Sequence, residues 1–134
     1  MRVTRSTRLL VLLIFVVAMM SALTACEDFK ATAYKTLFIA GQSYDTGMKT
    51  VADLQKAGSI TPEQRVVINK VAGKFYTTYQ SAVSALAIYS KTNSAVDKDK
   101  LITLVSAVVN EYPIFVKNIN SFAPGLLSNT LEVN

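Results

Sequence analysis

Three stretches of the chain carry apolar residues at spacings of three and four, and two short polar breaks separate them. This spacing places apolar side chains on one face of an α-helix. The predicted helices cover residues 29–57, 62–91 and 95–122. Because connections this short return each helix beside the previous one, the sequence predicts an all-α fold, an antiparallel three-helix bundle of long helices.

The two breaks contain signals for the end of one helix and the start of the next. Gly58 fits the position just after a helix. Thr61 fits an N-cap, Pro62 the first helical position and Gln64 the reciprocal partner of a capping box. In the second break Ser94 fits an N-cap. Both connections are therefore predicted as turns between packed helices.

The apolar faces indicate how the helices pack. Ala33, Ala40 and Gly47 are seven residues apart in the first predicted helix, so these small residues let a neighbouring helix approach closely. The second predicted helix carries apolar residues, Val67 and Val83 among them, on an arc about 160° wide, which is broad enough to face two neighbours.

The last predicted helix contains a proline. Its apolar pattern continues on both sides of Pro113, which predicts one kinked helix rather than two separate ones. The C-terminal tail, residues 123–134, is expected either to lie across the bundle or to fray.

An apolar run precedes the first predicted helix. Residues 9–23 are almost entirely apolar, three arginines precede them and small residues follow. This is the layout of a secretory signal peptide, here residues 1–25, which is cleaved from the mature protein. A retained transmembrane anchor is the alternative, because the run up to Ala25 has about 17 residues, the lower limit for spanning a bilayer.

The run ends in Leu23-Thr24-Ala25-Cys26, and Cys26 is the only cysteine in the chain. These four residues resemble the lipobox of bacterial lipoproteins. The resemblance implies cleavage before Cys26 and fatty acylation of its sulfur, with palmitate as a typical chain. Residues 26–28 would then form a short tether to a membrane of the cell envelope, and whether this is the inner or the outer membrane stays open. An ordinary thiol, free or paired between chains, is the alternative for Cys26.

Composition argues against several kinds of function. The chain has 14 basic and 9 acidic residues, but three arginines belong to the leader, which leaves 14 − 3 = 11 basic residues in the mature part. No cluster of basic residues indicates nucleic-acid binding. The chain has no histidine, and its one cysteine is assigned to the lipid, so the usual acid–base, nucleophilic and metal-binding residues are missing. We expect no enzymatic activity, no metal and no cofactor.

Two groups of residues are candidate binding sites. Phe38, Ile39 and Ile114 fall outside the apolar faces, so they are candidates for an exposed partner surface. Six aromatic residues on core-facing arcs are candidates for a pocket in the bundle core: Tyr44, Phe75, Tyr79, Tyr89, Tyr112 and Phe115.

The function expected from these observations is non-enzymatic. The chain is predicted to be a lipid-anchored interaction or structural module of the cell envelope that modulates or blocks a neighbouring envelope protein, or associates with itself. The alternative is binding of a small amphiphile or lipid in the core pocket.

Overall fold

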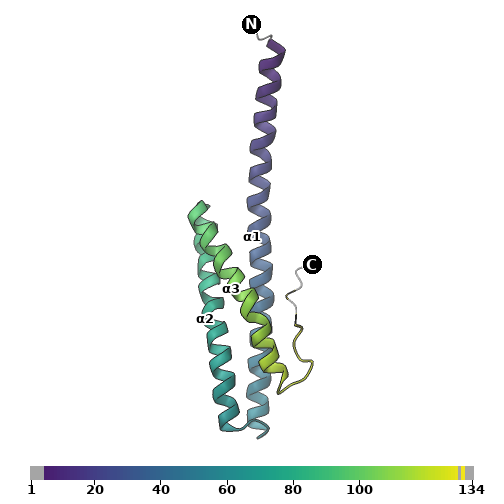
Figure 1. Ribbon diagram of the computed structural model, residues 1–134, viewed down its shortest axis with the longest axis vertical. Helices are drawn as coiled ribbons and strands as arrows, with labels where there is room; N and C mark the ends of the chain where they lie inside the picture. The colour runs from purple at the N-terminus through teal and green to yellow at the C-terminus, as the bar shows by residue number, and fades with distance from the viewer. Residues whose placement is uncertain (1–4, 130, 132–134) are drawn as a thin grey trace. The chain divides into compact units, whose positions relative to one another are not determined.

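The computed structural model describes the backbone of residues 5–129 and 131, and side chains from Phe29 onward. The described chain contains no β-strand. It forms three α-helices, which are α1 (Arg5–Lys56), α2 (Pro62–Thr92) and α3 (Ala95–Asn120) (Figure 1). The all-α fold with three helices that the sequence predicts is therefore confirmed.

α1 begins much earlier than the sequence predicts. The prediction starts this helix at Phe29, after the expected cleavage, whereas the helix of the full chain starts at Arg5. The leader is rich in Leu, Ala and Met, which are good helix formers, and no glycine or proline precedes Gly41. The chain divides into two units, Met1–Thr32 and Ala33–Asn134, and the helical bundle lies in the second.

The predicted signals at the breaks act as expected. The Thr61 N–H donates to Gln64 Oε1 at 2.8 Å, and the Gln64 N–H donates to Thr61 Oγ1 at 3.3 Å, which completes the capping box. The Ser94 hydroxyl accepts from the Asp97 N–H at 3.1 Å. Gly58 has a φ of 71°, the left-handed conformation that glycine adopts readily after a helix.

The predicted end of α3 is two residues too late. The helix stops at Asn120, because the Phe122 N–H bonds to the carbonyl of Ile119, three residues back, and tightens the chain into turns. Pro113 lies inside α3, and the helix is continuous through it, as predicted. Whether the helix bends there stays a prediction.

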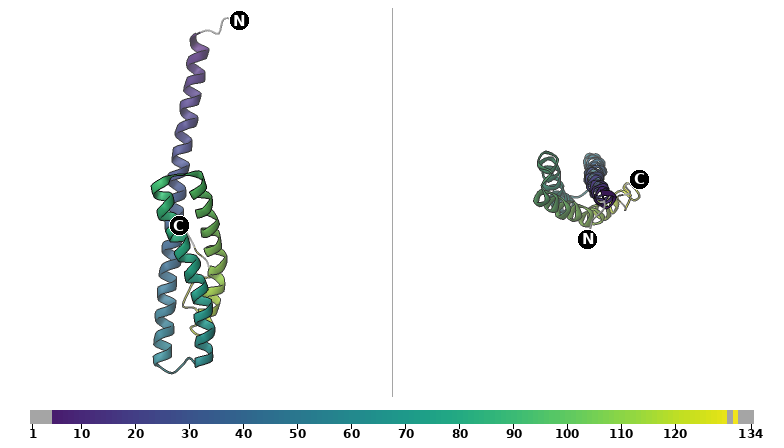
Figure 2. Two further views of the ribbon diagram at one scale, coloured as in Figure 1. Left: turned by 90° about the vertical axis from the view of Figure 1, so that its left-hand side faces the viewer. Right: turned by 90° about the horizontal axis from the view of Figure 1, so that it is seen from above.

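Within the second unit, α3 packs along α2 and crosses the C-terminal part of α1. Viewed along the helices, α3 lies across one side of the pair formed by α1 and α2 (Figure 2). Ala33 and Ala40 are 1% and 0% exposed, and Gly47 is also buried, so the line of small residues on α1 faces the core as predicted. The broad arc of α2 is only partly covered, because Val67 and Val83 are exposed.

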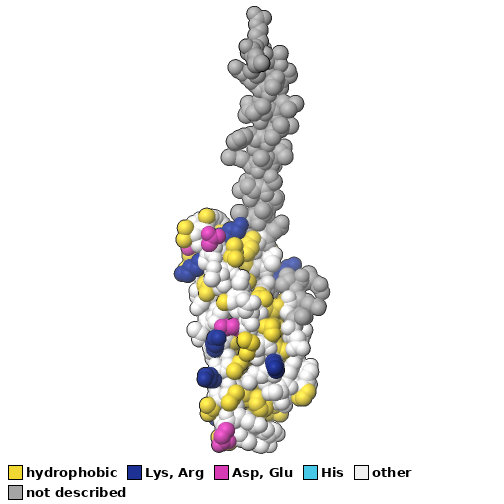
Figure 3. Space-filling model, in the orientation of Figure 1, with side chains coloured by type: hydrophobic (Ala, Val, Ile, Leu, Met, Phe, Trp, Pro, Cys, Tyr) yellow, Lys and Arg dark blue, Asp and Glu magenta, His cyan; other side chains and the backbone are white. Residues whose placement is uncertain are grey.

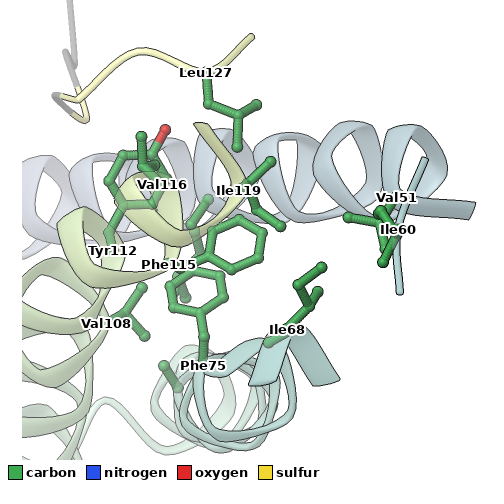
Figure 4. Packing of buried hydrophobic residues seen from close by; sticks show 14 residues of the cluster. Val51, Ile60, Ile68, Phe75, Val108, Tyr112, Phe115, Val116, Ile119 and Leu127 are labelled. Carbon is green, nitrogen blue, oxygen red and sulfur yellow. The ribbon is translucent and has the colours of Figure 1, made fainter. Parts of the chain in front are cut away.

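Aromatic rings fill the centre of the bundle. The rings of Phe75 from α2 and Phe115 from α3 stack with centroids 4.8 Å apart, and both side chains are buried (Figure 4). Tyr44 from α1 stacks on Phe115 at 5.7 Å, and Tyr112 meets Phe75 at 6.1 Å. Aliphatic residues surround these rings, among them Ile68, Val108, Val116 and Ile119.

The C-terminal tail lies across the bundle. The Leu127 side chain is buried and belongs to the hydrophobic core (Figure 4). The Asn120 side chain holds the Leu127 backbone at both polar groups: Nδ2 donates to the carbonyl at 2.9 Å, and Oδ1 accepts from the N–H at 3.0 Å. Of the two outcomes expected for the tail, packing is therefore the one found for its described residues.

Candidate functional site

Two neighbouring hollows follow the groove between α1 and α2, and they share Phe38 and Tyr79. The first, of about 340 Å³, is mainly apolar and is lined by Tyr34, Leu37, Phe38, Tyr79, Val83, Leu86, Ala87 and Ser90. The second, of about 320 Å³, is more polar and is lined by Phe38, Gly41, Gln42, Tyr44, Asp45, Tyr76, Tyr79 and Gln80. We call the two hollows together the α1–α2 groove.

Helical spacing brings these side chains to the groove. Tyr34 and Phe38 are four residues apart on α1, so they lie one above the other on the same face. Their rings stack at 6.1 Å with an angle of 15° between the planes. Tyr34 is 62% exposed and Phe38 is 52% exposed, so much of this aromatic pair is in contact with solvent.

Gly41 lines the polar hollow and lies against Tyr79, which borders both hollows. A Cβ atom at this position would lie 2.5 Å from the Tyr79 hydroxyl oxygen and 3.0 Å from the ring carbon that carries it. A glycine here lets the phenol lie directly against the α1 backbone, whereas a larger residue would displace the end of the Tyr79 side chain. The Tyr79 side chain therefore crosses the groove and separates its apolar half from its polar half.

The polar half combines aromatic faces with hydrogen-bonding groups. Tyr44 and Tyr76 stack at 4.8 Å, and Gln80 Nε2 donates to the Tyr76 hydroxyl at 2.7 Å. Burial raises the pKa of Tyr44, and the neighbouring Tyr76 and Asp45 raise it further. Burial is likewise the main cause of the raised pKa of Tyr79, followed by Asp45 and Tyr76. Both phenols therefore stay neutral at physiological pH and can donate hydrogen bonds to a partner.

The opposite flank of α1, where it meets α3, is covered around Gly47, and a hollow of about 290 Å³ lies further along it between Thr36, Val109 and Asn129. A Cβ atom on Gly47 would lie 3.1 Å from Phe115 and 3.3 Å from Leu127, so α3 and the tail both press against α1 here. The Tyr112 hydroxyl donates to the Ser128 carbonyl at 3.1 Å and shares a 3.0 Å hydrogen bond with Ser43 Oγ, which must be the donor. We call this side the α1–α3 flank.

The three residues predicted to form an exposed partner surface do not lie together. Phe38 lines the α1–α2 groove. Ile114 is exposed but borders a separate hollow of about 60 Å³ between α2 and α3, beside the ion pair between Lys74 and Glu111 (3.3 Å). Ile39 is only partly exposed. Of the three, only Phe38 belongs to the candidate site.

The six aromatic residues predicted to line a core pocket do not share one hollow. The rings around Phe75 and Phe115 contact one another, so they occupy the space that the prediction left for a ligand. Tyr89 is buried but lies outside this cluster. Tyr44 and Tyr79 line the α1–α2 groove at the surface instead. The prediction of a common core pocket is corrected accordingly.

Several residues of the groove were not singled out from the sequence. They are Tyr34, Gly41, Gln42, Asp45, Tyr76 and Gln80. The available signal was the spacing of three and four that links Tyr76 and Gln80 to Val83 on the apolar arc of α2. Such spacing does not distinguish a covered face from an open one.

Cys26 lies outside the residues whose side chains are described, and so does the apolar leader before it. From Phe29 onward, no helix has a stretch that is both long and apolar enough to cross a membrane. The same part of the chain contains no group of three or more His, Cys, Asp or Glu residues arranged to hold a metal ion.

Comparisons of the chain with protein-family models, with curated proteins and with solved structures found no match.

Proposed function

We propose that the chain is a non-enzymatic, lipid-anchored module of the cell envelope that binds another envelope protein through the α1–α2 groove. Anchoring rests on the leader and on Cys26, the single cysteine, at the end of a lipobox-like sequence. The observation that carries the binding role is the uncovered aromatic pair Tyr34 and Phe38 above a groove that no segment of the described chain fills.

The shape of the groove suits a helical partner. Two antiparallel helices present rows of side chains at spacings of three and four, and a third helix packs its own ridges between such rows. On α2 this row includes Tyr76, Gln80 and Val83, all exposed. A helix with an apolar face would cover the aromatic pair, while its polar edge could meet Gln80 and Asp45. Binding would thereby add a fourth helix to the bundle.

A second candidate function has one observation in its favour. The apolar half of the groove has a volume of about 340 Å³, within the usual range of small-molecule sites of about 300–1,000 Å³. A small amphiphile or lipid could lie there, with its polar end toward Gln42 and Asp45. The sequence suggested binding of an amphiphile in the core pocket, whereas here the binding site would be the surface groove.

Crosslinking in intact cells tests the proposal. A tagged chain would be compared with Cys26→Ser, Phe38→Ser and the control Val66→Ser, whose side chain is 69% exposed at the start of α2, outside the groove. We expect one protein partner that is lost with Cys26→Ser and with Phe38→Ser but kept with Val66→Ser.

Two results would contradict the proposal. A partner retained in full by Phe38→Ser would mean that binding does not use the groove. No partner for any variant, with lipid bound to the wild type but not to Phe38→Ser, would instead support the amphiphile role.

A further inference from the structure

One end of the second unit brings together the beginning of its α1 segment, the end of α2 and the start of α3. Tyr34 and Ser90 line the same hollow, and Ile88 borders another hollow with Lys100. We call this end the proximal tip, defined by Tyr34, Lys35, Ile88, Lys91, Val96 and Lys100. The α1 residues at this end are the residues of the unit that are nearest to Cys26 in the sequence.

The proximal tip exposes apolar side chains. Val96 is 78% exposed, the highest value among the large hydrophobic residues whose side chains are described. It is the second residue of α3, two positions after the Ser94 N-cap, and it lies outside the core. Tyr34 and Ile88 are also exposed. Exposed aliphatic side chains among lysines suit the interface of a bilayer, because lysine stems lie along apolar surface while their charged ends stay in water.

Lysines outnumber acidic residues around these apolar side chains. Lys35, Lys91 and Lys100 are exposed, and so is the acidic Asp99. The carboxylate of Asp97 accepts hydrogen bonds from the Thr92 hydroxyl at 2.6 Å and the Ser94 hydroxyl at 2.7 Å, so it is directed into the chain turn. Figure 3 shows hydrophobic, lysine and acidic side chains next to one another at the end of the bundle where α2 meets α3. Lysines in this arrangement complement anionic lipid headgroups.

The short segment between Cys26 and the second unit limits the distance between the membrane and the proximal tip. Seven residue steps separate Cys26 from Ala33, so even a fully extended chain spans at most about 25 Å. The α1 segment from Ala33 to Lys56 is a helix, and its far end is about 35 Å from its beginning at 1.5 Å per residue. A lipid on Cys26 therefore keeps the proximal tip close to the bilayer surface and leaves the other end free to stand away from it.

We propose that the proximal tip docks on an anionic lipid bilayer, with Val96 in the interface and Lys35, Lys91 and Lys100 facing lipid phosphates. This inference rests on the lipid anchor at Cys26 that belongs to the proposed function. Docking orients the bundle upright on the membrane and keeps the α1–α2 groove accessible from the side.

The absence of tryptophan from the chain allows a specific test. Val96→Trp and the matched control Val66→Trp each introduce a single fluorophore at an exposed position near the start of a helix. Residues 26–134, which include every residue of the hydrophobic core, would be coupled through the Cys26 thiol to a maleimide lipid in vesicles. The vesicles would contain phosphatidylcholine alone, or phosphatidylcholine with phosphatidylglycerol, each with and without brominated acyl chains.

We expect the Val96→Trp emission to shift to shorter wavelength and to be quenched by brominated lipid on the anionic vesicles, while Val66→Trp emission stays unchanged. Replacing Lys91 and Lys100 with Gln should weaken the binding of uncoupled protein to these vesicles by about fivefold per lysine. Equal quenching at both positions, or none at position 96, would overturn the proposal. Equal effects on neutral vesicles would overturn its electrostatic part.

Because the lipid is attached chemically, the result does not depend on acylation in the cell. Loss of the membrane-bound form with Cys26→Ser, measured in cells, tests the anchor separately. A tip that fails to dock on coupled vesicles therefore contradicts this inference alone, whereas an unacylated Cys26 contradicts the proposed function.

Discussion

The two flanks of α1 differ in what covers them. On the α1–α3 flank the chain supplies its own cover, because Leu127 packs against Gly47 and the Asn120 side chain fixes the tail backbone. On the side of the α1–α2 groove no described segment fulfils this role, and Tyr34 and Phe38 remain exposed. Both flanks are rich in large apolar side chains. The difference indicates that the first flank maintains the fold and the second is available for binding.

The largest expected difference in the free energy of unfolding is between substitutions of two phenylalanines, Phe115 on the α1–α3 flank and Phe38 in the α1–α2 groove. Phe115→Ala removes a fully buried ring of the central stack and should lower the free energy of unfolding by about 3–5 kcal/mol. Phe38→Ala removes a ring that is 52% exposed, so less buried area is lost and the free energy of unfolding should fall by only about 1 kcal/mol. Urea denaturation followed by circular dichroism measures both values. A large loss of stability from Phe38→Ala would show that the groove is structural.

The two glycines of α1 give a second contrast. Gly47→Val adds atoms between Phe115, Leu127 and Ile119, and should destabilise the fold by about 1–3 kcal/mol. Gly41→Ala meets only the end of the Tyr79 side chain, which can move into the open groove, so the gain of up to about 1 kcal/mol in helix propensity should prevail. Thermal unfolding of both variants checks the signs. The same sign for both would contradict the contrast between the flanks.

A substitution at Asn120 tests whether the hydrogen bonds to the Leu127 backbone are needed to keep the tail on the α1–α3 flank. Asn120→Ala removes two hydrogen bonds to the Leu127 backbone and should cost about 1–2 kcal/mol. It should also expose the tail to limited proteolysis after Asn120. Asn69→Ala, at an exposed position on α2, is the control and should have no measurable effect. A protected tail in Asn120→Ala would mean that Leu127 alone holds it.

The smallest expected effect is a dependence of stability on alkaline pH. The raised pKa values of Tyr44 and Tyr79 mean that the unfolded chain loses these protons first as the pH rises above about 10. The contribution of these phenols to folding stability is therefore fully present below that pH. It is lost as the pH rises through their pKa values in the folded state. The stability difference between wild type and Tyr79→Phe, measured from pH 8 to about pH 11, should change in that window. A constant difference would show that Tyr79 is not shielded in the groove.

Local signals allowed much of the fold to be predicted. The capping box at Thr61 and Gln64, the N-cap at Ser94 and the glycine after α1 depend on nearby residues only, and all are found. The line of Ala33, Ala40 and Gly47 follows from helical period and faces the core.

Long-range packing could not be predicted in the same way. The contact of Asn120 with Leu127 and the tail over Gly47 has no periodic pattern behind it. The core pocket was predicted wrongly, because residue spacing gives the direction of Phe75 and Phe115 but not the contact between their rings. The groove was missed for a related reason. Spacing identifies apolar faces, but which of them stays uncovered depends on where α3 and the tail pack.

Site-specific photocrosslinking in cells tests the difference between the flanks most directly. A photoreactive phenylalanine analogue would replace Phe38 in the α1–α2 groove or Val109, which is 43% exposed beside the tail. We predict a discrete crosslinked product of higher mass from position 38 and none from position 109. A product from position 109 alone, or equal products from both positions, would contradict the assignment of the α1–α2 groove as the binding surface.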